Sequence, residues 1–126
     1  MSTKRFQDLR VYQLSEKLAD EIWQIVHNWK PLAQDTVGKQ IVRSADSIGA
    51  NIAEGMGRGS YQENKRFVRI ARGSLNETQH WLRRAYKRNL LTLEQTQSIK
   101  NIINELAPKL NSYLKSIGNT SNPNDQ

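Results

Sequence analysis

The sequence predicts an all-α protein, an antiparallel up-and-down four-helix bundle, on three observations. Four successive segments carry apolar residues at spacings of three and four, which is helical periodicity. None shows the apolar–polar alternation of a strand, and short links join them. The 126 residues suit one domain, which we expect to fill residues 1–118. Residues 119–126 hold no apolar anchor, so we expect a disordered tail there.

The first predicted helix covers about residues 9–29, with Asp8 as its expected N-cap. Its main apolar face consists of Val11, Leu14, Leu18, Ile22, Ile25 and Trp29. A second apolar strip lies beside this face and consists of Tyr12, Ala19, Trp23 and Val26. An apolar strip outside the core must be covered by something. It is either an aromatic-rich edge of the core or a subunit interface containing Tyr12 and Trp23.

The second helix is expected over residues 36–56, with a buried stripe of Val37, Ile41, Ala45, Ile48 and Ile52. Glycine inside a helix costs about 1 kcal/mol relative to alanine. The glycines at 38, 49 and 55 therefore indicate that a neighbouring backbone comes close. The glycines of residues 55–59 then end the helix and supply a turn.

The third and fourth helices each begin at a capping-box pattern, Ser60-x-x-Glu63 and Thr92-x-x-Gln95. The third is expected to run about thirty residues, to Asn89 or Leu91. Its predicted core face is Phe67, Ile70, Ala71, Ser74, Thr78, Trp81, Leu82 and Ala85. The fourth is expected to stop at Gly118, and Pro108 should kink it or break it near Ala107.

The net charge of +7 is concentrated in one segment. Residues 58–88 hold nine basic and two acidic side chains, while the rest of the chain holds ten of each. On a helical wheel, five of these cations lie opposite Phe67 and form what we call the basic stripe: Lys65, Arg69, Arg72, Arg83 and Lys87. We predict Arg58 as a further nucleic-acid-binding residue, which would extend the stripe if the helix continued back through the glycines.

The basic stripe would be roughly 33 Å long at about 1.5 Å per residue. Like charges on one helix face repel one another, which does not favour folding. An anion bound to the stripe would explain these like charges, because phosphates release their counterions when lysine and arginine neutralise the phosphate charge. No aromatic residue is interleaved in the stripe, so we expect backbone contacts to nucleic acid rather than base reading. The alternative is a solvated face that keeps the protein soluble.

Composition and motifs argue against several other classes of protein. The chain has no cysteine, which suits a reducing cytoplasm, and no apolar run near the ~20 residues of a membrane helix. Glu77 and His80 match the Glu-x-x-His element of di-iron sites in helix bundles. Such sites need a second Glu-x-x-His element, and the other histidine, His27, has no glutamate three residues before it. Glu54 and Asn51 are better explained as hydrogen-bonding groups. We expect a cytoplasmic protein without catalytic activity, metal, cofactor or membrane partner.

Three motifs occur in order along the chain. They are Phe6-x-Asp8-Leu9-x-Val11, the stretch from Gln40 to Gly55 that ends in Asn-Ile-Ala-Glu-Gly, and Phe67-x-x-Ile70-Ala71-x-Gly73-Ser74-x-x-Glu77. With them, residues 6–115 resemble the four-helix-bundle proteins encoded in intervening sequences of bacterial 23S ribosomal RNA genes. The accessory variability determinant of diversity-generating retroelements is similar.

This resemblance implies an up-down-up-down bundle that assembles into a five-fold ring and has no catalytic activity. In the retroelement branch it also implies a basic surface that binds nucleic acid and a reverse transcriptase. The motif residues it assigns to structural roles are Asn51, Glu54, Gly55, Gly73, Ser74 and Glu77. Two functions follow as hypotheses. The first is a homo-oligomeric, pentameric protein that binds nucleic acid, with RNA and DNA both open. The second is a protein–protein adaptor or scaffold that binds no nucleic acid directly.

Overall fold

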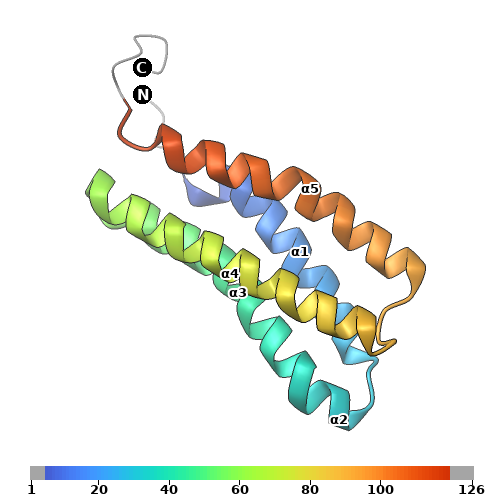
Figure 1. Cartoon of the computed structure of the whole chain (residues 1–126). Helices are drawn as coiled ribbons and strands as arrows, with labels where there is room; N and C mark the ends of the chain where they lie inside the picture. The colour runs from blue at the N-terminus through green and yellow to red at the C-terminus, as the bar shows by residue number, and fades with distance from the viewer. Residues whose placement is uncertain (1–4, 120–126) are drawn as a thin grey trace.

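Four long antiparallel helices form the bundle in the computed structural model, which describes residues 5–119 (Figure 1). They are α1 (Arg10–His27), α3 (Lys39–Met56), α4 (Tyr61–Lys87) and α5 (Leu93–Ser116). Residues 5–119 contain no strand, so the predicted fold class is confirmed. The tail predicted over residues 119–126 lies, apart from Asn119, outside the described residues.

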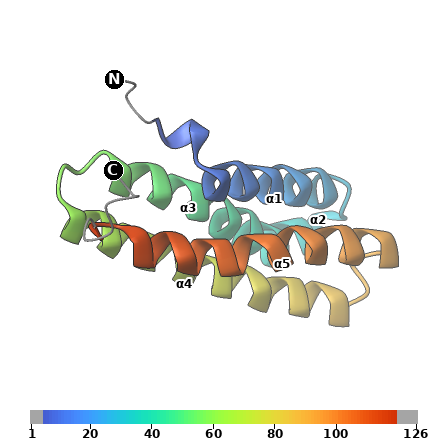
Figure 2. The ribbon, with the colours of Figure 1, turned by 90° about the horizontal axis from the view of Figure 1, so that it is seen from above.

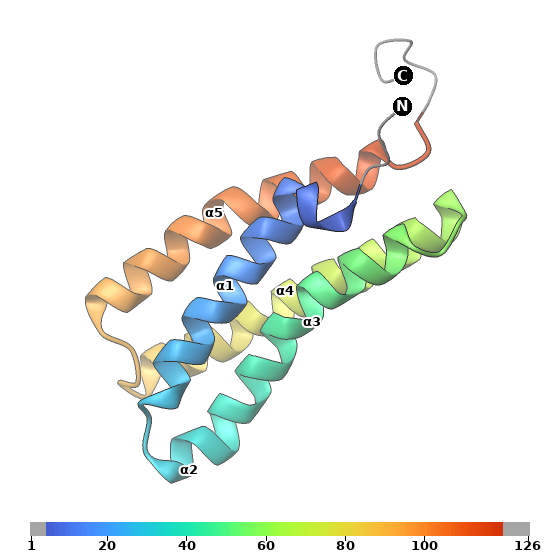
Figure 3. The same cartoon turned by 180° about the vertical axis from the view of Figure 1, so that it is seen from behind.

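The helices form a four-sided arrangement in which each contacts two neighbours (Figures 2 and 3). α3 packs most closely against α4, α1 lies between α3 and α5, and the α4–α5 side is the most loosely packed. The core runs along the centre and is built from Leu, Ile and Val of all four helices, including Leu18, Ile48, Val68 and Leu106, each fully buried. Burial of each such side chain contributes about 1.5–3 kcal/mol.

The close α3–α4 contact depends on small residues, as the glycines and serines of α3 predict. A Cβ atom added at Gly55 would lie 2.7 Å from the Asn64 side-chain oxygen and 3.0 Å from the Asn64 carbonyl oxygen. Further along the same contact, the Thr78 hydroxyl donates to Ser44 (3.0 Å) and the Ser74 hydroxyl to Ser47 (3.1 Å). These short polar side chains let the two backbones approach.

Two predicted helix starts differ from the structure. Asp8 is not the N-cap of α1, because Phe6–Asp8 form a 3-10 turn in which Asp8 pairs with Arg5, and Leu9 takes the extended cap conformation. The second helix starts earlier than residue 36. It begins with α2 (Pro31–Ala33) and continues through a π-helical turn, Gln34–Gly38, into α3. Proline at the first helical position explains the early start.

Pro108 does not break α5, which is helical from Leu93 to Ser116. The side chains of Leu106 and Leu110 are fully buried on either side of it, while Pro108 itself is exposed. The buried leucines fix the turns before and after the proline, so tertiary packing outweighs the lost hydrogen bond. Gly118 follows the helix with φ of +75°, the left-handed conformation expected of a stop.

The core face of α4 is rotated from the predicted one. The buried residues are Val68, Ala71, Leu75, Thr78 and Ala85, whereas Ile70 is 41% exposed. Phe67 is only half-buried, and the guanidinium groups of Arg58 and Arg66 lie 4.9 Å and 4.6 Å from its ring centre. The two cations cover the ring by cation–π contact, so Phe67 does not mark the centre of the core.

Candidate nucleic-acid interface

The basic stripe lies on a single uninterrupted helix. The Ser60 hydroxyl accepts a hydrogen bond from the Glu63 backbone N–H (3.1 Å) and caps the start of α4 at the predicted residue, while the Glu63 carboxylate pairs with Arg66 instead of closing the capping box. All five stripe residues fall within the 27 residues of α4. Because the core face is centred between Ala71 and Val68, the stripe is not directly opposite the core. Lys65, Arg72 and Arg83 instead lie on the edge of α4 next to α5.

None of the five stripe cations forms an ion pair within residues 5–119. The acids near the start of α4 pair with other cations: Glu63 with Arg66 (3.0 Å) and Glu54 with Arg58 (3.4 Å). The hydrogen bond from Arg66 lowers the pKa of Glu63. The strongest polar contact of the stripe is a long hydrogen bond from Arg72 to the Asn111 side-chain oxygen (3.4 Å). The stripe therefore keeps its positive charge uncompensated.

Arg58 does not belong to this line of charge. It lies in the turn between α3 and α4, where it pairs with Glu54 and covers the Phe67 ring. The helix does not continue back through the glycines, because Gly59 has φ of +85°. Arg58 is thus placed on a different side of α4 from the stripe.

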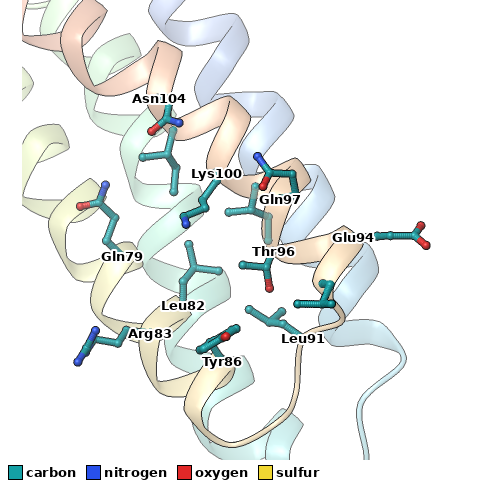
Figure 4. Close-up of a pocket in the computed structure, with 13 residues that line it drawn as sticks. Gln79, Leu82, Arg83, Tyr86, Leu91, Glu94, Thr96, Gln97, Lys100 and Asn104 are labelled. Carbon is teal, nitrogen blue, oxygen red and sulfur yellow. The ribbon is translucent and has the colours of Figure 1, made fainter.

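Two grooves between α4 and α5 extend the site beyond α4. The basic groove, of about 570 Å³, is lined by Lys65, Arg69, Arg72, Asn111, Leu114 and Lys115. The apolar groove, of about 860 Å³, lies at the other end of α4 and has Arg83 on one wall and Lys100 on the other (Figure 4). Sequence reasoning missed Lys100 and Lys115, because α5 belongs to the part of the chain with no net charge.

The two predicted interface residues of α1 differ in their surroundings. Tyr12 is half-buried within its own chain: its ring packs edge-on against Phe6 at 4.9 Å, and its edge lies over Gly49. Trp23 is 57% exposed and covers no part of the core. The aromatic-edge interpretation therefore fits Tyr12, and Trp23 is left for another contact.

The polar residues considered for catalysis are engaged in structural contacts. Glu77 is bonded to Arg43 of α3 and accepts a hydrogen bond from the Trp81 indole (3.1 Å). His80 packs its ring edge-on against Trp81. The Asn51 amide donates to the Ser47 carbonyl oxygen one turn earlier (2.8 Å). Across the described part of the chain, no three His, Cys, Asp or Glu side chains are grouped to hold a metal ion.

Comparison with known proteins identifies the family of this chain. The family model described as 23S rRNA-intervening sequence protein matches residues 7–112. The chain belongs to the 23S rRNA-intervening sequence protein family. No curated protein matches the sequence. Within residues 5–119, no helix is long and apolar enough to cross a membrane.

The chain is also similar to a solved structure. It is the crystal structure of a protein of unknown function from the S23 ribosomal protein family of Bacteroides thetaiotaomicron VPI-5482. The two chains are 31% identical and superpose with a TM-score of 0.73, over 83% of this chain and 98% of the other. The chain thus shares its bundle fold with a protein of the S23 ribosomal protein family.

Proposed function

We propose that this member of the 23S rRNA-intervening sequence protein family is a non-catalytic cytoplasmic protein that binds nucleic acid along the basic stripe of α4. The observation that carries the proposal is the absence of any carboxylate partner for the five stripe cations within residues 5–119, although acids pair with cations immediately beside them. Unpaired, aligned cations suit a polyphosphate backbone. The link of the family to 23S rRNA genes supports nucleic acid as the anion.

The test compares two variants of equal net charge. In the stripe variant, Lys65, Arg69 and Arg83 are each changed to glutamine. In the control variant, Lys17, Lys30 and Lys39 are changed to glutamine; all three are exposed and lie outside the stripe. Fluorescence anisotropy at low salt should show that the stripe variant binds labelled RNA and DNA about tenfold more weakly or worse, because phosphate contacts are lost.

The control variant should bind within about twofold of the wild type, since its lost charges act only at long range. Equal losses in both variants would mean that net charge alone attracts the nucleic acid, and the stripe would not be a site. Wild-type binding to RNA and to DNA in parallel titrations establishes which of the two is preferred.

A second candidate function, a protein–protein adaptor, is favoured by the exposed Trp23 of α1. The partner would be an acidic or nucleic-acid-bearing protein, such as the reverse transcriptase that the retroelement resemblance implies. Affinity capture with and without nuclease separates the two functions. Partners lost on nuclease treatment support direct binding of nucleic acid, whereas partners retained support the adaptor.

We also propose that the chain forms a homo-oligomer, a pentameric ring, with Trp23 in the subunit contact. An exposed indole on a helix face otherwise leaves apolar surface in water. Sedimentation at micromolar concentration should give several times the 14.5 kDa of one chain. Trp23→Glu should reduce the mass to that of a monomer without loss of helical circular dichroism. A monomeric wild type would contradict the ring.

A further inference from the structure

We propose that the apolar groove between α4 and α5 binds unstacked bases of single-stranded nucleic acid whose phosphates lie on the basic stripe. This inference rests on the proposed function and names its preferred ligand. The groove lies beside the C-terminal part of the stripe: Arg83 belongs to the stripe and also lines the groove. A strand that follows the stripe would therefore bring its bases to the groove.

The lining of the groove suits a base. Tyr86 of α4 lines the groove and is 49% exposed, so part of its ring surface is available for stacking. Leu82, Ile99 and Ile103 supply the apolar surroundings. Stacking on an aromatic side chain tolerates any base, because every base has a π-face. The groove volume of about 860 Å³ leaves room for more than one base.

Polar side chains at the groove could meet the edges of a base. Gln79 on α4 and Asn104 on α5 line opposite walls, and neither side-chain amide is hydrogen-bonded among residues 5–119. Free amides both donate and accept, as the edges of bases do. This mixture of one aromatic ring, free amides and cations favours a nucleobase over an amphipathic peptide helix, which would need a longer apolar surface.

The charges at the groove also suit a strand with a phosphate backbone. Lys100 reaches from α5 across the groove towards Leu82, with Arg83 on the opposite rim (Figure 4). Glu94, the acidic residue among the lining side chains, is directed away from the opening in the same view. Cations on both walls are within reach of phosphates that flank an inserted base.

The experiment compares strands that share a backbone but differ in their bases. Oligo(dT) and oligo(U) are each titrated against the full chain at low salt, beside an abasic strand with the same sugar and of the same length. The base-bearing strands should bind about tenfold more tightly than the abasic strand, as expected for stacking of one base. Tyr86→Ala should remove this preference without weakening abasic binding, and Tyr86→Phe should retain it. Unchanged abasic binding also shows that the variant is folded.

Tyr61→Ala serves as the matched control, because Tyr61 is an exposed tyrosine on α4 outside the groove. It should keep the preference for bases. Equal binding of base-bearing and abasic strands by the wild type would overturn the inference and leave the proposed function standing. Loss of the preference for bases in Tyr61→Ala would have the same consequence. If no strand binds the wild type at low salt, the proposed function fails and this inference fails with it.

Discussion

At the scale of single residues, two glycines of the family motifs occupy opposite environments. A Cβ atom added at Gly55 would face Asn64 and lie 2.9 Å from the Cβ of Phe67. A Cβ atom added at Gly73 would meet no atom within 4 Å. We expect Gly55→Ala to lower the free energy of unfolding by about 1–3 kcal/mol through overpacking. Gly73→Ala should raise it by about 0.5–1 kcal/mol through helix propensity. Urea unfolding measures both, and equal effects would contradict the α3–α4 packing.

Asp46 gives a residue-scale prediction of pH dependence. Asp46 is exposed, but partial desolvation against α1, and then the nearby Asp20, raise its pKa above its ordinary value. The folded state therefore favours the protonated form, and stability from this group is lost as the pH rises through about 4 and above. Asp46→Asn should raise the melting temperature at pH 7 but leave it nearly unchanged at pH 3.

Asp35, which is also exposed, is the control for this prediction, because it lies about one turn after Pro31, near the start of the helix that leads into α3. A carboxylate near a helix N-terminus is stabilising. Asp35→Asn should therefore bring no gain at pH 7. A gain in both variants would mean that removal of any negative charge stabilises the chain.

At the scale of the helices, α5 contains a proline that packing tolerates. Pro108→Ala should raise the free energy of unfolding by about 2 kcal/mol, since the gain of about 3 kcal/mol in helix propensity is offset by about 1 kcal/mol of unfolded-state entropy. Ser112→Ala, at an exposed position of the same helix, should change it by no more than about 0.5 kcal/mol. Denaturant titrations of both variants test this, and destabilisation by Pro108→Ala would show that the proline is needed in α5.

The helices were predictable where local chemistry decides them. Ser60 and Thr92 cap the starts of α4 and α5 where their patterns predict, and Thr92 forms the full capping box with Gln95. The rotation of α4 was not predictable, because large apolar residues such as Phe67 and Ile70 shifted the apparent centre of its apolar face. The true face is set by contact with α3, where Ser44 and Thr78 meet. Tertiary packing decides which apolar residues of a helix are left uncovered by its neighbours.

At the scale of the whole molecule, the charge of the stripe could be predicted, but the shape of the site could not. The unequal distribution of charged residues identified the stripe on α4. The two grooves depend on the loose contact between α4 and α5, and their lining joins residues such as Arg72 and Lys115 that are far apart in the sequence. In a ring, repeated stripes would strengthen a weak contact through multivalency.

The measurement that tests the central claim most directly is the salt dependence of single-strand binding. If the five stripe cations contact phosphates, the logarithm of the binding constant should fall with the logarithm of salt concentration with a slope of about −3.5 per chain. The stripe variant, which retains Arg72 and Lys87, should give about −1.4, and the Lys17, Lys30 and Lys39 variant should keep the wild-type slope. A stripe variant with the wild-type slope would contradict binding along α4.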